Sequence, residues 1–168
     1  MHDSGLHVSP SLDLRRAHPG DETAISSVLL EAFREYLPQY TPAGFAATTP
    51  APPEVLRRIE EGPVWLAMIQ SEVVGTVSAV MREERVIYIR GMAVLAQARG
   101  LRIGNLLFEL IEKYAKEQGC TKLVLSTTPF LDRAIRLYER LGFVRTDEGP
   151  HDLHGTPLFT MQKELVNR

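Results

Sequence analysis

Apolar residues follow a helical spacing between Ile25 and Tyr36 and form strand-like runs between Val64 and Val94. Between Ile25 and Tyr36 they recur every three or four residues behind Asp21, a candidate N-cap, and this spacing predicts an amphipathic helix. A short strand is expected before it, over Leu12–Ala17. Three apolar runs come later, and their short connections predict an antiparallel meander of Val64–Gln70, Val73–Met81 and Val86–Val94.

The second half of the chain alternates between strands and helices. Helical spacing predicts one helix from Gly104 to about Lys116, ended by Gly119, and another that is capped by Asp132 and ends at Gly142. A strand, a helix and a strand in succession favour one parallel pair inside an otherwise antiparallel sheet. The remaining strands are expected at Lys122–Ser126, Val144–Glu148 and Leu158–Lys163, with Gly149–Pro157 as a loop between the last two.

The segment Pro38–Pro53 follows neither pattern. It is rich in proline, which removes backbone donors and clashes inside helices, so we expect neither a regular helix nor a central strand here. We interpret it as a long loop with room for one helical turn, and long loops in compact domains are often functional. A short helix, Glu54–Glu61, is expected behind it.

Length, charge and cysteine content narrow the class of protein. The 168 residues, 44% hydrophobic and 24% charged, fit a single domain over residues 12–168 behind a loose tail of residues 1–11. The net charge of −2 argues against a nucleic-acid-binding protein, which usually has a basic face. No apolar run suits a membrane span and the first residues do not resemble a signal peptide, so we expect a cytoplasmic protein. The single cysteine, Cys120, excludes an internal disulfide and is expected to be a buried, unreactive thiol.

One turn between a strand and a helix is typical of an anion-binding site. The apolar strand Val86–Val94 leads into the turn Arg99–Gly104, which opens directly into a helix. The first backbone N–H groups of a helix have no acceptor within it, and the positive end of the helix dipole lies behind them. A diphosphate fits such a site, so the turn predicts a phosphorylated cofactor. The alternative is an ordinary turn without a ligand.

Three segments together resemble the GNAT superfamily of acyl-CoA N-acyltransferases. They are Met92–Val94 at the strand end, Arg99–Leu107, which is similar to the family's R/Q-x-x-G-x-G/A pyrophosphate loop, and Ala134–Phe143, which is similar to its A-x-x-x-Y-x-x-x-G-F helix. The resemblance covers about Leu12 to Leu165. It implies an α/β (α+β) fold, with a mixed, mostly antiparallel sheet of about six or seven strands flanked by about four helices. It also implies acetyl-CoA as cosubstrate, no metal, and the homodimers that are common in the family.

The resemblance assigns roles to residues of the strand, the turn and the last helix. Backbone groups of Met92 and Val94 are expected to bind the pantetheine arm, and the Met92 N–H to stabilise the oxyanion of the tetrahedral intermediate. Gly91 is expected to form a β-bulge, and Tyr138 to protonate the leaving thiolate. Backbone N–H groups of the turn are expected to bind the CoA pyrophosphate, namely those of Arg99, Gly100, Arg102, Gly104 and Asn105.

Spacing alone leaves simpler interpretations open, namely a plain strand at Met92 and a half-buried tyrosine on the apolar face of its helix at Tyr138. Two positions also depart from the family pattern. Arg102 stands in place of a glycine, and we expect it to keep helical backbone angles and its N–H group. Leu131 stands in place of an asparagine that contacts the pantetheine arm in many members.

The acceptor side is defined by fewer signals. Tyr88 and Arg90 stand where many family members carry a glutamate that acts as a base, and an arginine cannot be one. Segments that follow the first helix form the acceptor wall in the family, which makes Tyr36, Tyr40 and Phe45 candidates for it. The alternative is that these aromatic side chains simply anchor the proline-rich segment to the core. Arg90 favours an acceptor with a carboxylate or another anionic group.

Other candidates for a base lie on the first helix and in the last loop. Histidine has a suitable intrinsic pKa, and the two histidines of the loop also favour an anionic acceptor. An exposed hairpin tip is the alternative for this segment, and a His-x-x-His pair without a carboxylate is not a zinc site. These candidates are Glu31, Glu35, His151 and His154.

Two functions of different classes follow. The first is an enzyme that transfers an acetyl or short acyl group from acyl-CoA to a primary amine, which attacks the thioester directly in a ternary complex. The second is a non-catalytic module that binds acyl-CoA as a sensor or assembly element, which the missing carboxylate and Leu131 favour. A phosphotransferase fits poorly, because no Lys-Ser/Thr pair follows the glycines.

Overall fold

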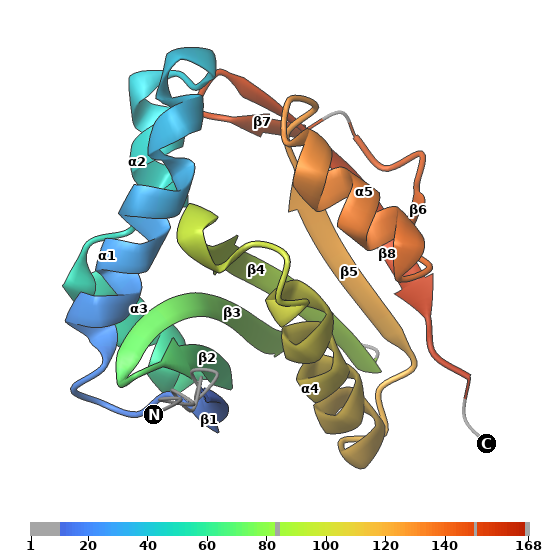
Figure 1. The fold of residues 1–168 in the computed structure, drawn as a ribbon. Helices are drawn as coiled ribbons and strands as arrows, with labels where there is room; N and C mark the ends of the chain where they lie inside the picture. The colour runs from blue at the N-terminus through green and yellow to red at the C-terminus, as the bar shows by residue number, and fades with distance from the viewer. Residues whose placement is uncertain (1–10, 83–84, 150, 167–168) are drawn as a thin grey trace, which may run out of the picture.

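One mixed sheet of eight strands runs through the molecule in the order β1-β2-β3-β4-β5-β8-β6, with β7 paired to β8 (Figure 1). The computed structural model describes residues 11–82, 85–149 and 151–166, so the expected tail falls outside it except for residue 11. Neighbouring strands are antiparallel except for β4 and β5, which are parallel as predicted. The strands are β1 (Leu12–Arg16), β2 (Val64–Ile69), β3 (Glu72–Arg82), β4 (Val86–Val94), β5 (Lys122–Thr127), β6 (Val144–Arg145), β7 (His151–Leu153) and β8 (Thr156–Glu164).

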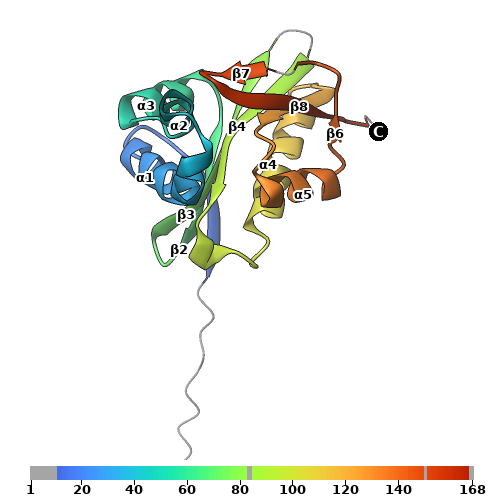
Figure 2. The ribbon, with the colours of Figure 1, turned by 90° about the horizontal axis from the view of Figure 1, so that it is seen from above.

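Helices cover both faces of this sheet (Figure 2). One side carries α1 (Glu22–Phe33), α2 (Pro42–Thr48) and α3 (Pro52–Glu61), and the other carries α4 (Ile103–Glu117) and α5 (Asp132–Arg140). The core fills the space between the layers, where Leu29 of α1, Val55 of α3 and Leu107 of α4 are fully buried. This is the mixed, mostly antiparallel α/β fold expected from the sequence, with α2 and β7 as additions.

The first addition, α2, forms in the proline-rich segment, so the expectation of a loop is wrong for residues 42–48. Pro42 occupies the first helical position, where its missing N–H group has no partner to lose. Thr41 caps the helix, because its Oγ1 accepts a hydrogen bond from the Gly44 N–H at 3.0 Å. Here proline starts a helix. A 3-10 helix, Arg34–Gln39, connects α1 to it.

The second addition, β7, lies in the expected loop Gly149–Pro157. It forms an antiparallel hairpin with β8, and the turn contains His154 at a φ of +51° and Gly155 at +93°. Thr41 binds this hairpin, since its N–H donates to Thr156 Oγ1 at 3.0 Å and its hydroxyl donates to the His154 carbonyl at 2.7 Å. The contact joins α2 to the hairpin at one end of the molecule (Figure 1).

Asp21 precedes α1 as expected, but its side chain does not cap the helix. Its carboxylate instead accepts two hydrogen bonds from the Arg15 guanidinium and one from the His18 N–H, each at 2.9 Å. The hydrogen-bonded Arg15 guanidinium lowers the pKa of the Asp21 carboxyl from 3.8 to about 2. This pair fastens β1 to the start of α1. At the other predicted start, Asp132 is the first residue of α5, and Leu131 is the N-cap.

The Asp21 carboxylate is expected to stabilise the fold at neutral pH and to lose this effect in acid. Because its pKa is lower in the folded protein than in the unfolded chain, the stabilisation is complete above about pH 4 and disappears as the pH falls toward about 2. Solvent partly screens Arg15, so we expect Asp21→Asn to lower the free energy of unfolding by about 1–2 kcal/mol near neutral pH. Urea titrations from about pH 7 to about pH 2 measure this. A difference that stays constant over the whole range would contradict the assignment.

β4 bulges at the position predicted from the sequence. Its register with β3 shifts between Arg90 and Ala93, where Gly91 and Met92 together oppose a single residue of β3. Gly91 has a φ of +64°, in the left-handed region that favours glycine. β4 pairs with β5 only over Val86–Ile89, and beyond that the two strands diverge (Figure 1). The carboxyl-terminal half of β4 therefore has no strand partner on its β5 side.

Two further observations concern buried residues and the length of the helices. Cys120 is buried, as predicted, and burial raises the pKa of its thiol; Trp65 is buried as well. Within the part of the chain that the structure describes, no helix combines the length and apolar character needed to cross a membrane.

Candidate functional site

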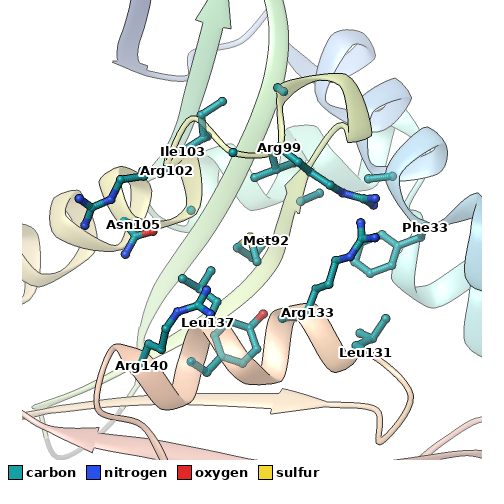
Figure 3. A pocket seen from close by; sticks show the side chains of 18 of the residues that line it. Phe33, Met92, Arg99, Arg102, Ile103, Asn105, Leu131, Arg133, Leu137 and Arg140 are labelled. Carbon is teal, nitrogen blue, oxygen red and sulfur yellow. The ribbon is translucent and has the colours of Figure 1, made fainter.

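Two adjoining cavities open where β4 and β5 diverge. The first, of about 320 Å³, lies between the end of α1, the end of β4, the turn before α4, and α5 (Figure 3). The second, of about 350 Å³, is lined from α2, α3, β4, β5 and the β7–β8 hairpin. The two cavities share four lining residues and therefore meet between β4 and α5. The shared residues are Phe33, Met92, Leu131 and Tyr138.

The turn before α4 supplies backbone N–H groups to the first cavity. The N-cap of α4 is Arg102, which has a φ of +59° and a ψ of +28°. The expectation of helical backbone angles is therefore wrong, and this left-handed conformation explains why a glycine suits the position. No acidic side chain occupies the first turn of α4, where the N–H groups have no acceptor within the helix. All five turn residues predicted from the sequence line the cavity: Arg99, Gly100, Arg102, Gly104 and Asn105.

Four arginines form the rim of the first cavity (Figure 3). Arg99 and Arg102 come from the turn before α4, and Arg133 and Arg140 come from α5. The sequence analysis missed the pair on α5. Their spacing was a usable signal, because Arg133, Leu137 and Arg140 follow at i, i+4 and i+7 and so share one helix face. The rim carries a positive charge that suits an anionic ligand.

Gly104 has a packing role that its sequence motif does not reveal. A Cβ atom built on Gly104 would lie 2.7 Å from Leu137 Cδ2, so the glycine lets the Leu137 side chain rest against the first turn of α4. This contact brings α5 close to the amino end of α4. It also positions Tyr138, the next residue of α5, at the junction of the two cavities.

Tyr138 is buried at this junction. The residue is only 7% exposed, and its ring lies 5.6 Å from that of Phe108 and 6.0 Å from that of Phe143. Burial raises the pKa of Tyr138 well above its usual value, so the phenol stays protonated at neutral pH. The residue is thus part of the apolar face of α5, and it also presents a hydrogen-bond donor where the cavities meet.

Arginines and tyrosines line the second cavity. Three residues predicted for the acceptor side, Tyr40, Tyr88 and Arg90, all line it. Arg58 of α3 and Arg82 at the end of β3 line it too, and the sequence analysis missed both. The Arg82 guanidinium lies over the Tyr88 ring, with its Cζ 3.8 Å from the ring centroid. Because the three arginines come from separate elements, no sequence spacing brings them together.

The other predicted acceptor residues lie elsewhere. Tyr36 lines the first cavity instead of the second, and Phe45 packs against the Tyr40 ring at 5.8 Å. His151 and His154 are exposed and line neither cavity, which corrects their assignment. The hairpin that carries them lies at the sheet edge, where β7 pairs only with β8 and both imidazoles remain in solvent.

Neither candidate base on the first helix reaches the cavities. Glu31 is exposed on α1, and Glu35 Oε1 accepts a hydrogen bond from Arg99 Nη2 at 2.5 Å. Among the described residues, no Asp, Glu or His lines either cavity. Across the same ranges, no three His, Cys, Asp or Glu side chains gather in a way that could hold a metal ion.

Two relatives illustrate the sequence similarity to known proteins. N-acetylaspartate synthetase of Danio rerio is 36% identical over 85 residues, which cover 50% of this chain and 30% of that protein. N-acetyltransferase 8B of Rattus norvegicus is 33% identical over 89 residues, which cover 50% of this chain and 40% of that protein. The chain thus spans less than half the length of these relatives.

Solved structures share the fold over nearly the whole chain. A GNAT-family acetyltransferase from Staphylococcus aureus Mu50 superposes with a TM-score of 0.77 and 17% identity, over 93% of this chain and 100% of that one. PaiA N-acetyltransferase from Thermoplasma acidophilum, in complex with coenzyme A, also gives a TM-score of 0.77 and 17% identity, over 92% of this chain and 99% of that one. The family model described as Acetyltransferase (GNAT) family matches residues 28–143. Because this match covers more than half of the 168 residues, the chain belongs to the GNAT family of acetyltransferases.

Proposed function

We propose that this chain is an N-acetyltransferase that transfers an acetyl or short acyl group from acyl-CoA to a primary amine. The observation that carries the proposal is the junction at Met92 and Tyr138, where two substrates can meet from two separate cavities. The names of the sequence relatives and the coenzyme A complex of PaiA support acetyl-CoA as the donor. Direct transfer needs no acyl-enzyme, and the thiol of Cys120, the only cysteine, is fully buried.

The first cavity fits coenzyme A in its chemistry. The four-arginine rim and the N–H groups at the start of α4 suit phosphates. Apolar side chains, among them Phe33, Leu131 and Leu137, suit the pantetheine arm. Met92 and Val94 follow the last residue of β4 that pairs with β5, so their backbone groups would bind the pantetheine amides as a neighbouring strand would. Leu131 would contribute apolar contact where an asparagine would donate a hydrogen bond.

Arg102→Gly is expected to stabilise the protein and to weaken coenzyme A binding. Glycine adopts a φ of +59° without strain, so we expect the free energy of unfolding to rise by about 0.5–1 kcal/mol. Loss of one guanidinium from the rim is expected to raise the Kd for coenzyme A by about three- to tenfold. Urea denaturation and calorimetric titration measure the two effects.

Arg85→Gly is the matched control. Arg85 also has a left-handed backbone, at a φ of +61°, but it lines neither cavity. We expect the same gain in stability with an unchanged Kd for coenzyme A. If both variants bound coenzyme A equally well, the Arg102 side chain would have no role in phosphate binding.

The proposed reaction assigns separate tasks to Met92 and Tyr138. The amine nitrogen attacks the thioester carbon, and the Met92 N–H donates a hydrogen bond to the oxygen on which charge develops. The new C–N bond gives a tetrahedral intermediate, and when this collapses the C–S bond breaks and Tyr138 gives its proton to the departing sulfur. The amine releases one proton, which passes through water and restores the phenol. The thiolate forms in the same poorly solvated space as the phenol, which raises the proton affinity of both groups.

Two measurements test this function. Titration of the purified chain with coenzyme A and acetyl-CoA should release or absorb heat with a Kd in the micromolar range, on the order of 10⁻⁶–10⁻⁴ M. Incubation with acetyl-CoA and a panel of primary amines should release free thiol in step with amine acetylation. The proposal fails if neither nucleotide binds at millimolar concentration, or if no amine is acetylated by a chain that binds both.

A non-catalytic acyl-CoA-binding module is the second candidate. The observation in its favour is the lack of an Asp, Glu or His among the described residues that line the cavities. Binding of acetyl-CoA without thiol release across the whole amine panel would establish it. The enzyme remains the stronger candidate, because a binding module would not need the second cavity beside Met92.

The proposal also keeps three finer predictions from the sequence: a cytoplasmic protein, a homodimer, and no nucleic acid or membrane as partner. Light scattering of the purified chain measures its oligomeric state directly.

A further inference from the structure

The second cavity carries positive charge without a carboxylate of its own. Arg58, Arg82 and Arg90 line it, and none of the described lining residues is an Asp or Glu. Glu61 pairs with the Arg90 guanidinium but is not a lining residue. The Arg90 Nε atom nevertheless remains enclosed without a hydrogen-bond partner. An anion that entered this cavity would meet hydrogen-bond donors and no carboxylate among the described lining residues, and it would compete with Glu61 for Arg90.

Arg58 is the least satisfied of these guanidiniums. Its Nε atom is also enclosed without a partner, and its side chain forms no ion pair with any described residue. Glu54, one turn earlier on α3, pairs with Arg57 instead. Burial lowers the pKa of the Arg58 guanidinium, and the neighbouring charge of Arg90 lowers it further, although Glu54 and Glu61 offset part of this shift. Two poorly solvated cations placed together are stabilised by an anion between them.

Arg58 lies against the bulge of β4. A Cβ atom built on Gly91 would meet Arg58 Nη1 at 3.1 Å, so the guanidinium contacts the strand at this residue. The next residue is Met92, whose N–H group is proposed to bind the thioester oxygen. Consecutive Cα atoms are about 3.8 Å apart, so an anion on Arg58 would be held close to the reacting carbon. Such an arrangement suits an acceptor whose anionic group is only one or two bonds from the carbon that carries its amine.

We propose that the acceptor is a small amine with an adjacent carboxylate, such as an α-amino acid, and that Arg58 and Arg90 bind this carboxylate in the second cavity. The inference rests on the proposed acetyltransferase function. The carboxylate would pair with both guanidiniums and hold the amine at the junction of the cavities. Tyr40, Tyr88 and Leu158 line the remaining space and would contact the acceptor side chain.

Matched acceptor pairs test the carboxylate. We would compare phenylalanine with 2-phenylethylamine, and leucine with 3-methylbutylamine, by thiol release at saturating acetyl-CoA. O-phosphoethanolamine, an amine with a phosphate in place of the carboxylate, is the third arm. We expect kcat/KM to be at least about tenfold higher for the amino acid of one or both pairs. Equal or better use of the decarboxylated amines, or a preference for O-phosphoethanolamine, would overturn the proposal.

Variants of Arg58 test the binding residue. Arg58→Gln is expected to raise the KM for the amino acid by about a hundredfold and to leave the KM for the decarboxylated amine unchanged. Arg58→Lys should recover part of the loss. Arg57→Gln is the matched control, because Arg57 is the adjacent residue of α3 and its side chain is 67% exposed. Equal losses for both members of an acceptor pair would show that Arg58 supports the fold and does not bind the carboxylate.

Binding measurements separate this inference from the function on which it rests. If amines are acetylated without regard to a carboxylate, the acetyltransferase function stands and the carboxylate site fails. If no amine is acetylated, the acetyltransferase function fails. The carboxylate site is then tested by itself, by calorimetric titration of the coenzyme A-saturated chain with phenylalanine. Binding that Arg58→Gln abolishes and Arg57→Gln preserves would support the site, whereas the absence of binding would overturn it.

Discussion

Tyr138→Phe is expected to lower kcat by about 10²–10³-fold and to leave the Kd for coenzyme A within about twofold of the unmodified chain. The substitution removes only the hydroxyl, so the ring can keep its contacts with Phe108 and Phe143. Without the phenol proton, the thiolate must leave as an anion in a poorly solvated space, which raises the barrier for breaking the C–S bond. Thiol release at saturating acetyl-CoA gives kcat, and calorimetric titration gives the Kd.

Tyr114→Phe is the control for this experiment. Tyr114 also lies on a helix against an aromatic ring, 5.8 Å from that of Trp65, but it lines neither cavity. The Tyr114→Phe variant should therefore keep the kcat of the unmodified chain. A Tyr138→Phe variant that retains more than about a third of kcat would remove Tyr138 from the reaction. A loss of coenzyme A affinity equal to the loss of kcat would instead assign the hydroxyl to binding.

The turn that lines the first cavity could be located from the sequence because its residues are contiguous in the chain, whereas Arg133 and Arg140 of α5 were not predicted. The turn residues from Arg99 to Asn105 and the bulge at Gly91 depend on local backbone geometry, which a glycine-bearing motif encodes. The conformation of Arg102 could not be read in the same way, because an arginine carries no signal for a positive φ. Only the surrounding turn forces that angle.

The acceptor side depends on contacts between distant elements, and the sequence analysis was weaker there. Arg58, Arg82 and Arg90 meet because α3 lies against the face of the sheet that carries β3 and β4. The histidines of the β7–β8 hairpin were assigned to the acceptor on their chemistry alone, and the structure leaves them in solvent. Residue type therefore predicted what could bind an anion, and tertiary packing decided which residues reach the cavity.

The two segments expected to be loops show why local composition misled the prediction of two elements, α2 and β7, within a fold that was predicted correctly. Proline predicts a break inside a helix, but Pro42 and Pro52 both stand at the first position of a helix, where proline is favoured. The strand β7 is only three residues long, too short for a periodic signal. The long amphipathic helices and apolar strands were predicted in the right order, since each extends over enough residues for its spacing to be distinct.

Gly91→Val is expected to lower kcat by about 10²-fold or more, chiefly because it changes the shape of β4. Valine, being β-branched, strongly disfavours the φ of +64° found at Gly91, and it favours a regular strand. Removing the bulge would turn the Met92 N–H away from the junction and would press a side chain against Arg58, whose Nη1 lies 3.1 Å from the position of a Cβ atom. We also expect a loss of about 1–3 kcal/mol in the free energy of unfolding. Thiol release at saturating acetyl-CoA and urea denaturation measure the two effects.

Gly119→Val separates strain from catalysis. Gly119 has a similar φ of +70°, has open space around its Cα and lies at the far end of α4, so its substitution should destabilise the protein without changing kcat. If the two variants fold and show the same kcat, the bulge is needed only for stability and the Met92 N–H does not bind the oxyanion. If only Gly91→Val loses kcat, and the KM for the acceptor stays unchanged, the loss comes from the direction of the Met92 N–H group and not from displacement of Arg58. The bulge would then be the feature of β4 that joins the two cavities into one reaction site.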